Sequence, residues 1–243
     1  MCRHTAWLGE QRTLQQLLLD PPCSLLRQSW APRRQRHGTV NADGFGVGWY
    51  DGSRAEPARV RHAVPMWAER TFASIAGVIR SGCVLGAVRS ATAGGPGGAE
   101  ACAPFRLAGD VLLSHNGRLP AAQVAPLVSA AALARIGSTV DSAFLAALVD
   151  ERLGEGLPAA VAGAVRAAAA VAPDARLNVL ATDGRTVVAI TWGDTLCWRR
   201  DAAGTTVASE PHDDEPGWND VPDRCLLVAT AAGAPTVTPI EGA

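Results

Sequence analysis

The chain contains no lysine, and all 22 of its basic residues are arginine. Together with 23 acidic residues they give a formal net charge of −1 at pH 7, so no overall field attracts nucleic acid or an anionic membrane surface. Each cation is instead a planar guanidinium, which can pair with a carboxylate through two parallel hydrogen bonds. Binding is therefore expected at a local site, and we expect neither a nucleic-acid nor a membrane partner.

Long apolar runs are also absent, since none reaches the length of a membrane-spanning helix. The first residues lack the charged-then-apolar order of a signal peptide, so we expect a cytoplasmic protein. The six cysteines lie far apart and form no C-x-x-C pair, which argues against a disulfide framework. Cys2 and His4 are two residues apart, but no second pair has the spacing of zinc ligands. We therefore expect no metal site.

The composition is that of a folded protein, with 48% hydrophobic and 19% charged residues in 243. This length is compatible with one domain, and we expect a single domain over residues 1–243. Apolar alternation or short apolar runs predict strands over residues 2–8, 41–50, 84–90, 111–114, 177–182, 186–192, 195–199, 205–209 and 225–230. Leucine- and alanine-rich segments predict helices over residues 13–19, 24–30, 121–136, 141–152 and 158–171. Two blocks of strands flanking helices predict a layered α+β fold with the sheets in the middle.

Three glycines occupy alternate positions in one predicted strand, at Gly44, Gly46 and Gly48. Alternate residues of a strand share a face, so this face carries no side chains. We expect another part of the chain to approach its backbone closely.

Cys2 is the first candidate for chemistry. Removal of Met1 would leave one residue with both a thiol and a free α-amino group. An α-amino group has a pKa of about 7.7–8.0 and can accept the thiol proton directly or through a water. The alternative is an ordinary cysteine at the start of a strand, and position alone does not decide between the two.

His115-Asn116-Gly117 follows a predicted apolar strand, so we expect a turn that exposes the Asn116 amide and the Gly117 N–H. Two such donors can stabilise an oxyanion. The alternative is a plain Asn-Gly hairpin turn.

Two charged residues stand at the ends of other predicted elements. Arg89, at the end of a buried strand, can bind a carboxylate through two hydrogen bonds, or it is a surface cation. Asp141, at the start of a helix, can hold an ammonium group, or it only stabilises the first turn. An arginine and an aspartate together would recognise the head group of an α-amino acid.

These segments occur in the order found in class II glutamine amidotransferases, which the chain resembles over almost its whole length. The residues that carry the resemblance are Met1-Cys2, 41–49, 89–92, 114–117 and Asp141-Ser142. The resemblance implies an α+β fold, the four-layer αββα sandwich of N-terminal-nucleophile hydrolases with two antiparallel sheets. It also implies cleavage of a γ-glutamyl amide without a metal or an organic cofactor.

The resemblance further implies the catalytic roles. Cys2 would attack the γ-carbonyl and form a glutamyl thioester, with its own amino group as the base. Asn116 Nδ2 and the Gly117 N–H would stabilise the oxyanion of the tetrahedral intermediate.

The same resemblance implies a substrate-binding set for the glutamyl group. Arg89 would bind its α-carboxylate and Asp141 its α-ammonium. Ser90, Thr92 and His115 belong to the same expected set.

Within the family, three segments are similar to the amidohydrolases of ergothioneine biosynthesis: 2–9, 30–33 and 208–211. These hydrolyse γ-glutamyl hercynylcysteine sulfoxide to glutamate and hercynylcysteine sulfoxide. Members that use glutamine have Cys-Gly-Ile at the start, and a Trp and a His flanking the arginine motif. Here Arg3 replaces the glycine and Ser90 the tryptophan, and no histidine follows Thr92.

Two other functions fit the same motifs. One is a glutaminase subunit that supplies ammonia to a synthase. We expect no synthase domain after Thr230, so the synthase would be a separate protein. The other is a non-catalytic regulator that binds a glutamyl group. The stand-alone hydrolase requires only its small γ-glutamyl substrate and no obligate protein partner. Its leaving group carries a trimethylammonium, for which an aromatic face or a carboxylate is expected. The candidates are Trp30, Trp49, Trp67 and Trp218.

Overall fold

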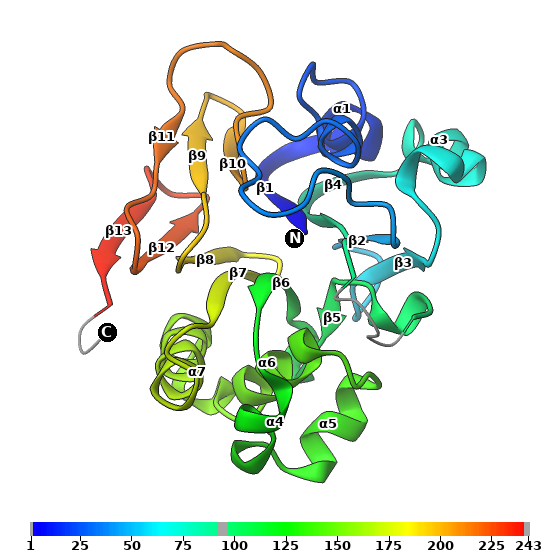
Figure 1. Cartoon of the computed structure of the whole chain (residues 1–243). Coiled ribbons are helices and arrows are strands. Elements are labelled where there is room, and N and C mark those ends of the chain that lie inside the picture. The colour runs from blue at the N-terminus through cyan, green and yellow to red at the C-terminus, as the bar shows by residue number, and fades with distance from the viewer. Residues whose placement is uncertain (1, 92–96, 241–243) are drawn as a thin grey trace.

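The computed structural model describes residues 2–91 and 97–240, and these residues build two sheets in which all neighbouring strands are antiparallel (Figure 1). In spatial order the first sheet contains β11 (Asn219–Asp220), β9 (Cys197–Arg200), β10 (Gly204–Ala208), β1 (Arg3–Thr13), β4 (Arg80–Val88), β2 (Phe45–Trp49) and β3 (Ala58–His62). The second contains β13 (Thr236–Pro239), β12 (Cys225–Thr230), β8 (Thr186–Thr191), β7 (Arg176–Thr182), β6 (Leu112–Arg118) and β5 (Phe105–Arg106).

Helices cover the outer face of each sheet. The first sheet packs against α1 (Leu14–Leu18), α2 (Leu25–Gln28) and α3 (Arg70–Ala76). The second packs against α4 (Ala121–Val124), α5 (Ala130–Ile136), α6 (Asp141–Asp150) and α7 (Leu157–Val171). Short 3₁₀ turns lie at η1 (Met66–Ala68), η2 (Ala99–Ala101), η3 (Ala108–Asp110), η4 (Ala125–Leu127) and η5 (Leu153–Glu155). The four-layer αββα arrangement expected for this chain is confirmed.

Successive side chains along a strand point to opposite faces of its sheet, and both faces of each sheet carry apolar side chains. In β4, Val84 packs toward the helices of its own sheet, whereas Leu85 packs toward the other sheet. In β6, Leu113 packs toward the helices and Leu112 toward the first sheet. The space between the sheets is therefore an apolar core, except near the start of β1, where polar side chains gather.

The glycines of the predicted bare strand lie in β2 and just before it, and other segments approach them as expected. A Cβ on Gly46 would lie 2.2 Å from the carbonyl oxygen of Ala103, and one on Gly48 would lie 2.5 Å from the side chain of Leu112. Such separations are shorter than carbon contacts allow. The absence of side chains lets the 102–104 loop and the second sheet pack directly on the β2 backbone.

Several predictions of element boundaries were wrong. The predicted helix over residues 121–136 is three pieces, α4, η4 and α5, because Pro126 interrupts it. The strands β3, β5, β11 and β13 and the helix α3 had not been predicted.

Among the described residues, no single helix is long and apolar enough to cross a membrane. Taken together, α5 and α6 have sufficient length and apolar composition, but they are bent by 112° relative to each other.

Candidate active site

A cavity of about 310 Å³ opens where the start of β1, the end of β4, the end of β6 and the start of α6 meet. Ligand pockets begin at about this size. Six residues of the predicted site line it: Cys2, Arg89, Ser90, His115, Gly117 and Asp141. They come from four segments that lie far apart in the sequence, and the fold brings these segments to one cavity. Thr92 lies outside the described residues.

The sheet register places the nucleophile candidate beside the arginine motif. Arg3 pairs with Val88 across β1 and β4, so Cys2 faces the residues that follow the end of β4. The Cys2 thiol is half-buried, with its Sγ 3.9 Å from the carbonyl oxygen of Ser90. Burial raises the pKa of Cys2, with the nearby Arg89 acting in the opposite direction. The thiol is therefore protonated at neutral pH and requires a base to become a nucleophile.

The 89–91 segment is held by Asp43, which precedes β2. The Asp43 carboxylate accepts a hydrogen bond from the Ala91 N–H at 2.7 Å. The backbone carbonyl oxygen of Asp43 accepts a second one from Arg89 Nη1 at 3.2 Å. In the backbone, the Asp43 N–H donates to the carbonyl oxygen of Arg89, and the Arg89 N–H donates to the carbonyl oxygen of Gly44. The Asn41–Gly44 segment thus fixes the position from which Arg89 reaches the cavity.

Asp141 is the first residue of α6, and its carboxylate links two elements. One oxygen accepts the N–H of Leu119, just after β6, at 3.1 Å, and the other accepts the N–H of Ser142 at 2.8 Å. A carboxylate offers about four acceptor sites. Asp141 therefore keeps acceptor capacity for an ammonium group in the cavity.

His115 uses both ring nitrogens within the protein. Its Nε2 lies 2.8 Å from the carbonyl oxygen of Arg176 and must donate, so Nδ1 accepts from the Ser142 hydroxyl at 2.9 Å. Burial lowers the pKa of His115, so the ring is neutral. His115 therefore ties β6 to α6, and only its ring carbons remain for contact with a ligand.

The predicted turn at Asn116-Gly117 was wrong, because both residues lie inside β6. Asn116 pairs with Asn178 and Gly117 with Leu177 of β7. A Cβ at Gly117 would lie 1.8 Å from the carbonyl oxygen of Arg176, so close strand approach explains this glycine. The alternative of a plain Asn-Gly hairpin turn is also wrong, because both residues pair with β7 inside β6.

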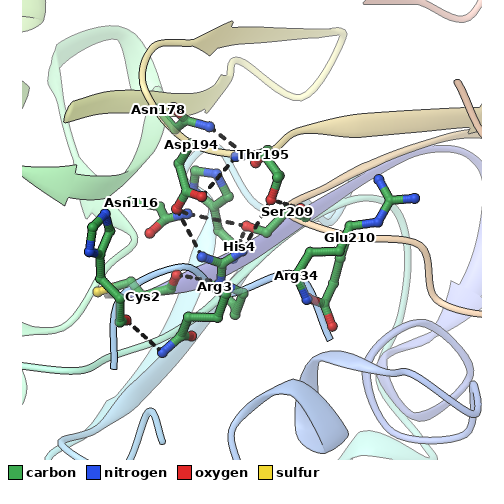
Figure 2. Close-up of polar contacts among 12 residues, drawn as sticks. Cys2, Arg3, His4, Arg34, Asn116, Asn178, Asp194, Thr195, Ser209 and Glu210 are labelled. Carbon is green, nitrogen blue, oxygen red and sulfur yellow. Dashed lines mark hydrogen bonds and ion pairs between the residues drawn. The ribbon is translucent and has the colours of Figure 1, made fainter. Parts of the chain in front are cut away.

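Asn116 is fully buried and is not among the residues that line the cavity. Its side chain is on the side of β6 that faces the first sheet, where Nδ2 lies 3.4 Å from Asp194 Oδ2 and 3.5 Å from Ser209 Oγ (Figure 2). Both distances exceed those of strong hydrogen bonds. Its Oδ1 has no hydrogen-bond partner among the described residues.

The four tryptophans proposed for the leaving group do not line this cavity. Trp30 and Trp67 form an exposed edge-to-face pair with ring centroids 5.7 Å apart. Trp49 packs on the helix-covered face of the first sheet, and Trp218 lies against His212. The aromatic residues at the cavity are phenylalanines from β2 and β5.

Two buried carboxylates near the site were not predicted. Glu210 accepts the backbone N–H groups of Arg33 and Arg34 at 2.9 and 2.7 Å, which holds the basic loop after α2. Asp194 pairs with Arg3. Only the Ser-Glu-Pro sequence around Glu210 stood out in the chain, and no local pattern marks Asp194.

No cluster of three or more histidine, cysteine or acidic side chains that could hold a metal ion occurs within residues 2–91 and 97–240.

The profile of the family Glutamine amidotransferases class-II matches residues 18–215. A gamma-glutamyl-hercynylcysteine sulfoxide hydrolase of Mycolicibacterium smegmatis is 49% identical over 240 residues, 99% of this chain and 100% of its own. The protein of the same name from Mycobacterium tuberculosis (strain CDC 1551 / Oshkosh) is 49% identical over 100% of this chain and 98% of its own.

Solved structures show the same fold. A glutamine aminotransferase class-II domain protein from Silicibacter pomeroyi has a TM-score of 0.72 at 22% identity, covering 99% of this chain and 100% of its own. Glutamine phosphoribosylpyrophosphate amidotransferase from B. subtilis has a TM-score of 0.72 at 18% identity, covering 100% of this chain and 50% of its own. At these identities the likeness concerns the fold alone.

Proposed function

This chain belongs to the class II glutamine amidotransferases, and we propose that it hydrolyses the γ-glutamyl amide of γ-glutamyl hercynylcysteine sulfoxide to glutamate and hercynylcysteine sulfoxide. The observation that carries the proposal is the 49% identity with hydrolases of this name over essentially the whole length of both chains. The cavity supports it, because it brings a thiol, a guanidinium and a carboxylate together. We place this activity in the cytoplasm, as part of ergothioneine biosynthesis, with no obligate protein partner.

The first half of the reaction forms a thioester on Cys2. After removal of Met1, the Cys2 amino group takes the thiol proton while sulfur attacks the γ-carbonyl carbon. We assign stabilisation of the resulting oxyanion to the Gly117 N–H at the cavity wall and to Nδ2 of the adjacent, buried Asn116. The C–N bond then breaks, and the leaving amine receives the proton from the Cys2 ammonium.

The second half releases glutamate. Water attacks the thioester carbonyl, gives its proton to the Cys2 amino group, and the C–S bond breaks to regenerate the thiol. During both halves Arg89 holds the α-carboxylate of the glutamyl group and Asp141 its α-ammonium, which keeps the γ-carbon beside Sγ. The 89–91 segment, including Ser90, forms the adjacent wall. Every proton in this scheme moves between substrate, water and residues of this chain.

Arg118 supports a peptide-like substrate over glutamine. It lines the cavity one residue beyond Gly117, is exposed, and forms no ion pair among the residues that the structure describes. The cysteinyl part of the leaving group carries a carboxylate next to the amide nitrogen, whereas ammonia from glutamine carries none. We assign this carboxylate to the Arg118 guanidinium.

Glutamate release from two substrates tests the proposal. We expect kcat/KM for γ-glutamyl hercynylcysteine sulfoxide to exceed that for glutamine by about 10²-fold or more, because only the former engages the leaving-group subsite. Equal or faster hydrolysis of glutamine, increased by a protein that co-purifies, would instead identify an ammonia-supplying subunit. Glutamate binding without thioester formation, seen by intact mass, would identify a regulator.

A further inference from the structure

A buried ion pair includes Arg3, the residue that follows the proposed nucleophile. Arg3, the first residue of β1, and Asp194, in the turn after β8, have side chains that are 0% exposed, and Arg3 Nη2 lies 2.9 Å from Asp194 Oδ2. Removing two charges from water costs more than such a pair usually returns in stability. Stability alone therefore does not account for this pair, and its contacts with neighbouring groups become informative.

The pair contacts the main chain of one proposed catalytic residue and the side chain of another. Arg3 Nε donates to the carbonyl oxygen of Cys2 at 2.8 Å. Asp194 Oδ2 lies 3.4 Å from Asn116 Nδ2. Figure 2 shows the contacts from Arg3, Asn116 and Thr195 meeting at the Asp194 carboxylate. One ion pair thus connects the proposed nucleophile, just before β1, to the amide on β6, across the two sheets.

The Asp194 carboxylate is itself held in place. Its Oδ1 accepts the N–H of Thr195 at 2.8 Å. The Thr195 hydroxyl donates to the carbonyl oxygen of Ser209 at 2.8 Å, which ties this turn to the end of β10. The carboxylate therefore presents its second oxygen to Arg3 and Asn116 in a fixed direction.

The same carboxylate selects one orientation of the Asn116 amide. With Nδ2 toward Asp194, a donor meets an acceptor; rotating the amide by half a turn would place its oxygen against the carboxylate. An amide nitrogen has two N–H groups, so one can stay with Asp194 while the other is given to an oxyanion. The 3.5 Å contact with Ser209 Oγ is long enough to be exchanged at small cost.

We propose that Asp194 is a positioning residue that fixes the amide of Asn116 for oxyanion stabilisation and, through Arg3, fixes the main chain of Cys2. The proposal rests on the function proposed above, because it takes the roles of Asn116 and Cys2 from there. It concerns a residue that the motifs of the chain do not mark.

Steady-state kinetics of Asp194→Asn and Arg3→Lys test the proposal. We expect kcat to fall by about 10²-fold, with KM changed less than threefold, because loss of an oxyanion donor acts only in the transition state. In the double variant Asn116→Ala/Asp194→Asn, kcat should fall by clearly less than the product of the two single losses, because Asp194 acts in part through Asn116. Losses that multiply in the double variant would overturn the proposal.

A matched control separates positioning from general stability. Asp150 also has a fully buried carboxylate in an ion pair, with Arg135 at 2.6 Å, but in the helical layer outside the second sheet. Asp150→Asn should lower Tm and leave kcat unchanged where the protein is folded. An equal loss of kcat in both aspartate variants would overturn the proposal. If Asp194→Asn does not fold, the double variant Arg3→Met/Asp194→Leu, which replaces the ion pair by two apolar side chains, is used instead. We expect this variant to fold and to have the same reduced kcat that we predict for Asp194→Asn. Full activity of this variant would overturn the proposal.

Alkylation of Cys2 distinguishes failure of this proposal from failure of the proposed function. A diazoketone analogue of glutamine reacts with the nucleophile independently of the leaving group, and intact mass gives the rate. If the wild-type protein is alkylated but does not hydrolyse the sulfoxide, the substrate assignment alone fails. Slower alkylation of Asp194→Asn than of Asp150→Asn supports positioning in either case, and equal rates overturn it.

Discussion

The Cys2 thiol, half-buried beside Ser90, has a raised pKa because of burial and is neutral at pH 7. Changing Cys2 to alanine removes the sulfur and leaves Arg89 and Asp141 in place. We expect Cys2→Ala to lose all hydrolysis of γ-glutamyl hercynylcysteine sulfoxide while still binding it, as measured by calorimetry. Turnover by this variant would exclude the thioester mechanism.

Arg118 carries a separate prediction about specificity. We expect Arg118→Ala to raise KM for γ-glutamyl hercynylcysteine sulfoxide by about 10- to 100-fold, because hydrogen bonds to a charged group contribute about 1.5–3 kcal/mol. Glutamine has no carboxylate on its leaving group, so its slow hydrolysis is the internal control and should not change. Equal losses with both substrates would place Arg118 outside the leaving-group subsite.

The sequence marked single residues for the candidate site where a motif stands at the start or the end of a predicted element. Cys2, Arg89 and Asp141 were found from such positions, and the structure brings them to one cavity; their individual roles stay predictions. Asn116 was placed in a turn because Asn-Gly favours turns, but pairing with β7 keeps it in a strand. Asp194 could not be found, because its partner Arg3 is 191 residues away and no periodic pattern encodes that contact.

Among the elements, β2 depends on its lack of side chains. A methyl group at Gly46 would meet the backbone of Ala103, which cannot move without shifting the 102–104 loop at the cavity wall. We expect Gly46→Ala to lower the free energy of unfolding by at least about 1–3 kcal/mol, as measured by urea denaturation.

The control for this substitution is Gly52→Ala, since a Cβ at Gly52 would have no heavy atom within 4 Å. Its effect should stay within about 0.5 kcal/mol. A loss of stability equal to that of Gly46→Ala would show that the cost arises from glycine removal itself rather than from contact with Ala103.

Elements with a strong apolar pattern were predicted and those without one were missed. The buried strands β4, β6, β7 and β8 and the helices α6 and α7 follow continuous apolar or alanine-rich segments. By contrast β3 contains alternating arginines and is half-buried along its whole length, and β5 and β11 have two residues each. Their pairing partners create such short strands, and partners cannot be read from a local segment.

For the whole molecule, three buried histidines make stability depend on pH. Burial lowers the pKa of His212 to about 4 and also lowers those of His4 and His115. The unfolded chain protonates these residues near pH 6.5, whereas the folded protein does not. Folding is therefore most favoured above pH 6.5, and stability falls as the pH decreases below it, by up to about 1.4 kcal/mol per pH unit for each histidine.

Urea denaturation between pH 7.5 and pH 5 measures this dependence. His212→Gln removes one titrating group that does not line the cavity of the proposed active site, so the stability of this variant should decline less steeply with falling pH than that of the wild type. Identical slopes for the two proteins would show that His212 does not resist protonation in the folded state.

The layered fold was predictable at this scale, whereas the strand order was not. Blocks of strands around helices predicted sheets in the middle with helices outside, and the resemblance to a family implied two antiparallel sheets in four layers. The order β10-β1-β4 places the first strand at the centre of its sheet, which no count of elements implies. The assignment of residues 1–243 to one domain stays a prediction.

That central position of β1 has a practical consequence for work with the gene. The strand is held on both sides, by Val88 opposite Arg3 and by Ala208 opposite Thr5, so it cannot slide to accommodate extra residues. Under the proposed mechanism, a translation start assigned one codon too early, or an affinity tag fused at this end, would block the amino group of Cys2. Expression plasmids should therefore carry the tag after β13, at the edge of the other sheet.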